Sequence, residues 1–350
     1  MATIQAMKAL VMTKPGEFAF QERPRPEPKN DELLLKVLRL GVCGTDLHAF
    51  EGTQPFFSYP RVVGHELAVQ IAGIPASALA SAGKLREGDL VSVLPYLSCG
   101  SCAACRKGKT NCCTSLKVLG VHVDGGMQEY LTVPAQYVVP AGKLSPADIS
   151  LVECFSIGFH AVRRASPLKG EAALVVGAGP IGIGVIHGLK EQGAKVIVLD
   201  INAKRLGYAK DTAKADYCIN SKETDPVKAL ADITGGEMPP LVMDATGNAA
   251  QMMKTFDFAG PGGTIVFVGL VRSDITFADP VLHAKEITLM ASRNATKEDF
   301  AGVIAGIESG RVDTSGFVTH TASLETAAAQ FPLWIKPETG CIKAAVAVSS

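Results

Sequence analysis

The sequence predicts an α/β protein of two domains, the first mainly β and the second built on a parallel sheet. Three observations lead to this prediction. The chain has 350 residues, which is more than one hydrophobic core usually supports. Its first 150 residues hold short β-rich runs separated by glycine and proline, with no helix of ordinary length before Ser145. From Glu171 onward, apolar runs alternate with helical patterns, which is typical of a parallel sheet with right-handed crossovers.

The composition favours a folded protein whose partners are neither nucleic acid nor membrane. Hydrophobic residues make up 47% of the chain and charged residues 19%, so a large core can form. The 34 Lys and Arg balance the 34 Asp and Glu, which leaves no surplus charge to attract phosphates. The start of the chain has no signal-peptide pattern. We therefore expect a cytoplasmic protein whose nine cysteines are thiols or metal ligands.

The expected elements follow from periodicity and turn residues. In the first part, strands are expected at Leu33–Leu40, Arg61–Ile74 and Asp89–Leu94. In the second part, six apolar runs predict the strands of the parallel sheet: 173–176, 195–199, 215–219, 241–244, 263–268 and 287–291. Helical patterns fill the gaps at about 181–191, 203–213, 226–234 and 248–258. A capping box at Thr296 and Asp299 opens a further helix that Gly310 ends, and short strand-like runs return after Val312.

A glycine-rich turn between the first predicted strand and helix of the sheet indicates a dinucleotide site. The turn reads Gly177-Ala178-Gly179-Pro180-Ile181-Gly182. Its glycines allow a tight turn, close approach of a pyrophosphate, and packing of helix on strand. Asp200 ends the next strand, where a carboxylate binds ribose hydroxyls and repels a 2′-phosphate, so NAD is favoured over NADP. Lys204 and Arg205 could still pair with a 2′-phosphate, and a turn without any nucleotide is the plainer alternative.

Five of the nine cysteines fall within fifteen residues, between Cys99 and Cys113. The spacing Cys99-x2-Cys102-x2-Cys105-x7-Cys113 places four sulfurs on one compact loop, which suits a closed, tetrahedral structural zinc. An iron–sulfur cluster is the main rival. Cys112 could compete with Cys113 for the fourth position, and the residues alone leave this open.

A second group of metal-ligand types is scattered along the chain, in Cys43-Gly-Thr45-Asp46-Leu-His48, in Gly64-His65-Glu66 and at Glu153. Together with the cysteine loop and the glycine motif, these segments resemble the zinc-dependent medium-chain dehydrogenases in order and spacing. The resemblance extends over nearly the whole length, through Asp124-Gly-Gly126, Asp244-Ala-Thr-Gly247 and Pro261-Gly-Gly263. It implies a GroES-like catalytic domain at 1–155 and 292–350, with a structural zinc lobe at 99–113, and a Rossmann domain at 156–291.

The resemblance also assigns roles. Cys43, His65 and Glu153 match the ligands of a catalytic zinc that keeps one position open, with Cys154 as an alternative to Glu153. Glu66 matches an acidic residue beside that metal, either a fourth ligand or an outer group. Thr45 matches the hydroxyl that takes the substrate's proton, and His48 the imidazole that passes it to solvent. Family spacing selects Cys113 over Cys112, so two zinc ions per subunit are expected. Val268 and Arg293 complete the expected cofactor-binding set.

The sequence of the Cys43 segment and the glutamate at position 153 are similar to those of the polyol, threonine and sugar-acid branch of the family. Arg293 and Asn294 follow the sixth predicted strand, and a guanidinium there would suit a substrate carboxylate. The expected reaction is NAD-dependent oxidation of a secondary hydroxyl of a polyol or sugar acid. Threonine or simple alcohols are alternative substrates, and a catalytically inactive NAD-binding protein is the alternative from another class. The family implies a homodimer or homotetramer.

Overall fold

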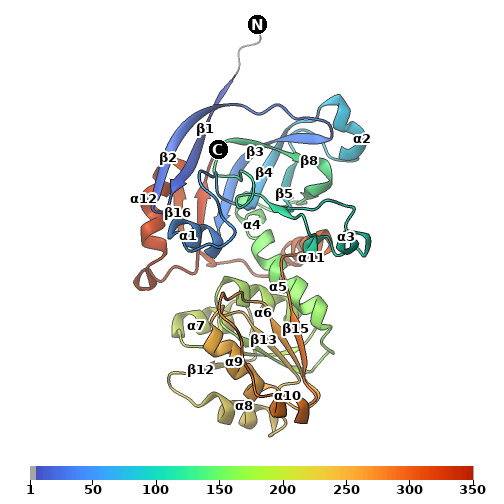
Figure 1. The fold of residues 1–350 in the computed structure, drawn as a ribbon, viewed down its shortest axis with the longest axis vertical. Helices are drawn as coiled ribbons and strands as arrows, with labels where there is room; N and C mark the ends of the chain where they lie inside the picture. Colours follow the sequence, from blue (N-terminus) through green and yellow to red (C-terminus); the bar gives the residue numbers. More distant parts are fainter. Residues whose placement is uncertain (1–4, 350) are drawn as a thin grey trace. The chain divides into compact units, whose positions relative to one another are not determined.

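The computed structural model describes residues 5–349, which form two compact units. The first unit contains residues 5–153, Thr296–Glu308 and 314–349, and the second contains Cys154–Ala295 and Ser309–Asp313. Figure 1 traces the chain through both units. No helix among the described residues is both long and apolar enough to cross a membrane.

The first unit is built on a seven-stranded sheet of order β16-β17-β3-β4-β5-β9, with β8 also paired to β3. Its strands are β3 (Glu32–Val42), β4 (Glu66–Gly73), β5 (Leu90–Val93), β8 (Tyr130–Pro134), β9 (Val138–Pro140), β16 (Val318–Ser323) and β17 (Lys343–Ala347). All pairings in this sheet are antiparallel except that of β16 with β17. In β3, Leu33, Leu35 and Val37 are fully buried, which is the period of two that a strand with one core face requires.

Two small sheets and several short helices complete the first unit. The sheets pair β1 (Ala6–Lys14) with β2 (Glu17–Pro24), and β6 (Tyr96–Leu97) with β7 (Lys117–Val118). The helices are α1 (Gly44–Phe50), α2 (Leu79–Ala82), α3 (Ala103–Arg106), α4 (Pro146–Ile149), α11 (Lys297–Glu308) and α12 (Leu324–Trp334). Single 3-10 turns occur at Ala76–Ala78, Thr110–Cys112, Ala135–Tyr137 and Pro337–Thr339. The predicted capping of α11 is confirmed, because Asp299 accepts hydrogen bonds from the amide and hydroxyl of Thr296, each at 2.8 Å.

The predicted length of one strand in the first unit is wrong. Arg61–Ile74 was expected to be a single strand, but β4 begins only at Glu66. Gly64 adopts a positive φ of 98°, and the backbone of residues 62–64 pairs with the loop 125–127 rather than with the sheet. The β1–β2 hairpin and helix α12 were not predicted.

The second unit confirms the predicted parallel sheet of six strands. The order is β12-β11-β10-β13-β14-β15, with every neighbouring pair parallel. Its strands are β10 (Ala172–Val176), β11 (Lys195–Asp200), β12 (Tyr217–Asn220), β13 (Leu241–Asp244), β14 (Thr264–Phe267) and β15 (Thr288–Ala291). The core packs around Leu174, Ile197, Val242 and Ile265, all fully buried. Such all-round burial is what a parallel sheet covered on both faces demands.

Helices α6 (Pro180–Glu191), α7 (Ala203–Asp211), α8 (Pro226–Thr234) and α9 (Ala249–Phe258) lie where helical patterns were expected. Two further helices, α5 (Val152–Ala165) and α10 (Asp279–Ala284), were not predicted. The division between the units falls inside α5, after Glu153. The rest of α5 packs closely on α6, because glycines stand at the crossing. A Cβ on Gly158 would lie only 2.2 Å from the backbone of Gly184.

This crossing yields a stability prediction. Gly158→Ala forces α5 and α6 apart, and we expect it to lower the free energy of unfolding by about 1–3 kcal/mol, the usual cost of overpacking. The measurement is the urea midpoint followed by circular dichroism. Gly207→Ala is the matched control, since Gly207 lies on α7 with open space around its Cβ position. The control is expected to be neutral or stabilising, and equal losses in the two variants would contradict the packing argument.

Candidate functional site

Among residues 5–349, metal-ligand atoms gather at two places, both in the first unit. One group joins Cys43, His65 and Glu66, and the other joins Cys99, Cys102, Cys105 and Cys113. Within each group the ligand atoms lie within 4.8 Å of one another. The structure therefore brings together most of the residues that the sequence proposed as metal ligands.

Cys43 is positioned by the junction between β3 and α1. It precedes the first residue of α1 and acts as its N-cap, in a capping box with Asp46. The Asp46 carboxylate accepts a hydrogen bond from the amide of Cys43 at 2.9 Å and another from the amide of Gly64 at 3.3 Å. Asp46 is fully buried and thus ties the Cys43 turn to the residue just before His65. The sequence reasoning gave Asp46 no role, although its position three residues after the cap was a readable signal.

His65 and Glu66 are positioned by a loop that holds the backbone before β4. The amide of Gly125 donates to the carbonyl of Val62 at 2.7 Å, and the amide of Gly126 donates to that of Gly64 at 2.9 Å. A Cβ on Gly125 would lie 2.2 Å from the Gly64 oxygen, so only glycine fits this contact. The Asp124-Gly-Gly126 motif therefore acts as a clamp: its backbone hydrogen bonds hold residues 62–64, which precede His65 and Glu66.

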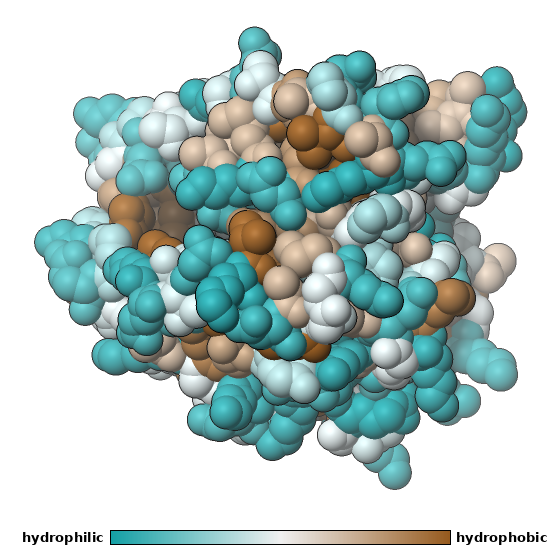
Figure 2. Space-filling model, turned by 90° about the horizontal axis from the view of Figure 1, so that it is seen from below, coloured by the Kyte–Doolittle hydropathy of each residue, from teal (hydrophilic) through white to brown (hydrophobic). Residues whose placement is uncertain are grey.

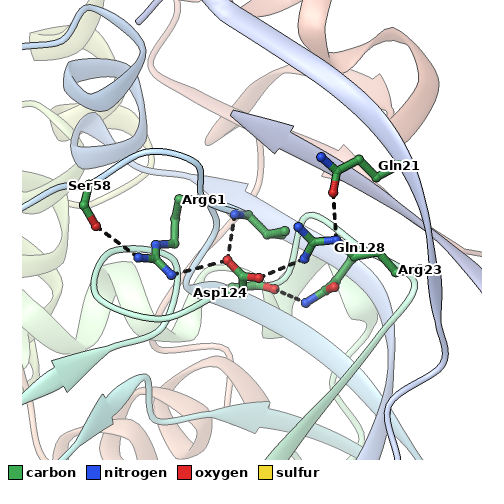
Figure 3. A network of polar contacts seen from close by, with 8 residues as sticks. Gln21, Arg23, Ser58, Arg61, Asp124 and Gln128 are labelled. Carbon is green, nitrogen blue, oxygen red and sulfur yellow. Dashed lines mark hydrogen bonds and ion pairs between the residues drawn. The ribbon is translucent and has the colours of Figure 1, made fainter. Parts of the chain in front are cut away.

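Asp124 anchors this clamp through a polar network (Figure 3). Its carboxylate accepts a hydrogen bond from the amide of Val62 at 3.0 Å and pairs with Arg23 at 2.8 Å and with Arg61 at 3.5 Å. The guanidinium of Arg61 also reaches Ser58 at 3.1 Å. The network connects β2 to the loops on either side of the ligand segment, which restrains the backbone that presents His65.

Two buried polar atoms at this group have no hydrogen-bond partner among residues 5–349. They are Nδ1 of His65, which lies 3.8 Å from Asp46, and Oε2 of Glu66. The other carboxylate oxygen of Glu66 accepts a hydrogen bond from the buried ammonium of Lys343. Burial alone would lower the pKa of His65, but the negative groups Asp46 and Cys43 beside it raise that pKa well above its usual value. The Nδ1 atom of His65 faces Asp46, so the unsatisfied carboxylate oxygen of Glu66, in a pocket of negatively charged groups, is the atom that a bound divalent cation would satisfy.

Glu153 lies near this group but has a different partner. It sits in the first turn of α5, is 4% exposed, and accepts a hydrogen bond from the hydroxyl of Tyr96. Burial raises its pKa, His65 opposes this, and Glu66 adds to it. Neither Glu153 nor its neighbour Cys154 belongs to the set of ligand atoms gathered within 4.8 Å. Tyr96 was missed by the sequence reasoning, because nothing local marks a partner 57 residues away.

Thr45 and His48 both lie on α1, three residues apart and therefore on one side of the helix. Thr45 is half-buried and follows Cys43 by two residues, whereas His48 is exposed. The exposure of the pair therefore increases along α1 from Thr45 to His48.

The four-cysteine loop forms around α3 and the turn at Thr110–Cys112. Backbone amides point at its sulfurs: that of Cys99 lies 3.2 Å from Cys113, and that of Cys102 lies 3.4 Å from Cys99. Amide donors lower the pKa of Cys99 to about 7 and that of Cys102 to about 5, which favours the thiolate that binds metal. Burial and neighbouring sulfurs raise the pKa of Cys105 to about 11. Cys113 is buried in the cluster, whereas Cys112 is exposed and outside it.

The glycine motif forms the expected turn in the second unit. Gly177 has a φ of 95°, and a Cβ on Gly182 would lie 1.8 Å from the Gly177 oxygen. Gly179 caps α6, whose first residue is Pro180. Asp200 at the end of β11 accepts hydrogen bonds from the amide of Ala178 at 2.6 Å and that of Asn202 at 2.8 Å. The carboxylate is thereby held against the turn where a nucleotide's phosphates would bind.

The remaining predicted cofactor residues lie at the same edge of the sheet. Val268 directly follows β14, and Arg293 follows β15 by two residues and is exposed. Arg205, on α7, places a guanidinium nitrogen 3.8 Å from the Cβ position of Gly179. The carboxyl ends of parallel strands are where nucleotides bind in open α/β sheets.

Comparison with known proteins agrees with this geometry. The profile of the alcohol dehydrogenase GroES-like domain matches residues 29–143, and that of the zinc-binding dehydrogenases matches residues 180–309. The chain belongs to the zinc-dependent alcohol dehydrogenase family. It is 42% identical to L-galactonate-5-dehydrogenase of Escherichia coli K12, over 93% of this chain and 94% of that protein.

Other dehydrogenases resemble the chain over similar lengths. Sorbitol dehydrogenase of Bacillus subtilis 168 is 32% identical over 92% of this chain and 91% of its own. A structure of E. coli CFT073 RspB, described as a short chain alcohol dehydrogenase and solved with NADH, matches with a TM-score of 0.90 at 31% identity, over 98% of this chain and 99% of that one. The predicted family, the GroES-like and Rossmann folds and the dehydrogenase class are therefore confirmed.

The cysteine loop yields a second prediction, in which two adjacent thiols serve as a matched pair. Cys113→Ser removes a buried sulfur of the cluster and is expected to cost one zinc ion per chain, measured by mass spectrometry of the metal content. Cys112→Ser alters an exposed thiol outside the cluster and is expected to keep all the zinc. Zinc loss in Cys112→Ser with retention in Cys113→Ser would reverse the assignment.

Proposed function

We propose that this zinc-type dehydrogenase oxidises a secondary hydroxyl of a polyol or sugar acid to a ketone, with NAD as the hydride acceptor. The overall reaction converts the alcohol and NAD⁺ into a ketone, NADH and one proton. The observation that carries the proposal is the group of half-buried Cys43 with buried His65 and Glu66, in which one carboxylate oxygen of Glu66 has no hydrogen-bond partner among residues 5–349, in a chain that also has the dinucleotide turn.

Cys43, His65 and the carboxylates Glu66 and Glu153 would hold the catalytic zinc. Zinc bound there would act as a Lewis acid toward the substrate hydroxyl. A thiolate, an imidazole and carboxylates are ordinary zinc ligands, so the donor set fits the metal. Glu153 is the third ligand by family resemblance, and Glu66 is the carboxylate gathered with Cys43 and His65 in this structure. A second, structural zinc would occupy the four-cysteine loop, giving two per chain.

Proton transfer is assigned to α1. The hydroxyl of Thr45, two residues from Cys43, would accept the proton of the substrate hydroxyl, and exposed His48 would pass it to solvent. The spacing of three residues keeps both side chains on one side of the helix. Asp46, between them in sequence, is buried and turned to the backbone, so it holds the turn rather than joining the relay.

The glycine turn and Asp200 would bind NAD in preference to NADP. The amides at the start of α6 suit the pyrophosphate, and the Asp200 carboxylate held at the turn would repel a 2′-phosphate. Arg205 lies close to the turn, where its guanidinium would favour NADP if Asp200 moved away. Arg205 therefore opposes Asp200 in the choice between NAD and NADP.

A sugar acid or polyol is the proposed substrate class because relatives named for L-galactonate and sorbitol match 93% and 92% of the chain. The exposed guanidinium of Arg293 would suit a carboxylate. We also propose a homodimer or homotetramer in the cytoplasm. Among the described residues, β15 pairs only with β14, and Leu270, Phe277 and Leu289 are exposed nearby in sequence. Hydrophobic residues interrupt the polar surface at several places on the face in Figure 2.

The proposed activity is tested by NADH absorbance with a panel of sugar acids, polyols, threonine and simple alcohols. We expect turnover with a sugar acid or polyol, and its loss in Cys43→Ala because the metal loses its thiolate. Cys218→Ala, which alters a half-buried thiol in the second unit, is the control and should keep activity. Wild-type turnover in Cys43→Ala would refute the site. Zinc-loaded, NAD-binding protein without turnover on any substrate would indicate an inactive NAD-binding protein instead.

Cofactor choice gives a separate prediction. Steady-state kinetics should show kcat/KM with NAD at least about tenfold above that with NADP, equivalent to roughly 1.4 kcal/mol. Asp200→Ser removes the carboxylate and should reduce this ratio, because the repulsion of a 2′-phosphate disappears. Asp216→Ser, which alters another carboxylate of the second unit away from the glycine turn, is the control. A wild-type preference for NADP would contradict the role of Asp200.

A further inference from the structure

Lys343 is a buried cation beside the proposed catalytic metal. It begins β17, its side chain is 2% exposed, and its ammonium lies 2.5 Å from Oε1 of Glu66, whose side chain is 1% exposed. An ammonium is costly to bury unless a charged partner compensates it. The two residues are 277 positions apart in sequence, so only the folded sheet brings them together.

The sheet explains how the pair forms. Strand β3 lies between β4 and β17, with Gly41 opposite both Glu66 and Ala345. Residues opposite one another share a face of a sheet, and so do residues two apart on one strand. Lys343 and Glu66 therefore lie on the same face as Gly41, on either side of its strand. A Cβ at Gly41 would lie 1.9 Å from Oε2 of Glu66, so the glycine leaves the space that the carboxylate occupies.

The two oxygens of Glu66 have different environments. Oε1 is held by Lys343, whereas Oε2 is buried without a hydrogen-bond partner among residues 5–349. We propose that Lys343 is a positioning residue for the catalytic metal, whose ammonium occupies one oxygen of Glu66 and leaves the other as the single oxygen offered to zinc. This inference rests on the proposed function, since it requires zinc at Cys43, His65 and Glu66.

The charges around the site support this role. The carboxyl groups of Asp46, Glu66 and Glu153 lie buried in one region, where Lys343 supplies positive charge and a zinc ion would supply more. An outer partner that orients a metal ligand typically changes metal affinity 10- to 100-fold when it is removed. A lysine that only filled space in the core would not act selectively on one metal site.

The test is a measurement of zinc affinity at each site by competition with a chelator, using the full-length protein. Lys343→Met is expected to weaken the catalytic site by about tenfold or more, while the four-cysteine site stays unchanged and serves as an internal reference. Lys343→Arg keeps the charge and is expected to restore most of the affinity. Lys285→Met is the control, because Lys285 is another partly buried lysine, which donates to the carbonyls of Phe256 and Ala259 in the second unit.

A double-mutant cycle shows whether Lys343 acts through Glu66. We expect Lys343→Met to cause no further loss in a Glu66→Gln background, because the carboxylate that it orients is already gone. This comparison also remains available if Lys343→Met alone fails to fold, since the double variant removes both charges of the Lys343–Glu66 ion pair.

The outcomes separate the two proposals. Unchanged zinc affinity in folded Lys343→Met, or losses that add in the double variant, would overturn the role of Lys343 alone. Wild-type protein that binds zinc only at the four-cysteine site would overturn the proposed catalytic site itself.

Discussion

The pairing of β3 with both β4 and β17 is the constraint on which the proposed catalytic site depends. Cys43 follows the end of β3, Glu66 begins β4 and Lys343 begins β17, so the backbone hydrogen bonds of one sheet bring these three side chains together. A slip of one residue in either pairing would turn Glu66 or Lys343 to the opposite face. If β3 itself slipped against both neighbours, its fully buried leucines would turn to the opposite face. The register that buries the core is therefore the register that assembles the site.

Loops complete what the sheet begins. The sheet fixes Glu66 but leaves His65 just outside β4, where no ladder hydrogen bond positions it. The glycine loop clamped by Asp124 and the buried carboxylate of Asp46 hold the backbone there from two directions. In both supports a carboxylate accepts a hydrogen bond from a backbone amide. Such a charged hydrogen bond is stronger than one between neutral groups. His65, which lies outside the sheet, is thus held in place by the glycine loop and by Asp46, which contact its neighbours.

Features set by neighbours in sequence could be predicted, whereas those set by distant neighbours could not. The glycine turn, the four-cysteine loop and the six parallel strands follow from local spacing and periodicity, and each appears where it was expected. Glu153 and Glu66 could be proposed as ligands only through family resemblance. Their partners, Tyr96 and Lys343, carry no local signal, because a buried tyrosine or lysine is recognised only once its carboxylate is in place. The overlong strand at Arg61 has the same origin, since its β-favouring residues pair with a remote loop.

The two metal sites therefore relate differently to folding. The sulfurs of the four-cysteine loop come from fifteen consecutive residues, so closing this loop costs little chain entropy, and a metal can organise it locally. The ligands of the catalytic group come from separate strands, so they converge only after the sheet has formed. Zinc proposed for the loop would contribute to building its lobe, whereas zinc proposed for Cys43 and His65 would bind a site that the fold has already shaped. Such a site, supported by Asp46 and Lys343, would leave a coordination position open for a substrate, whereas four sulfurs would fill the tetrahedral positions in the loop.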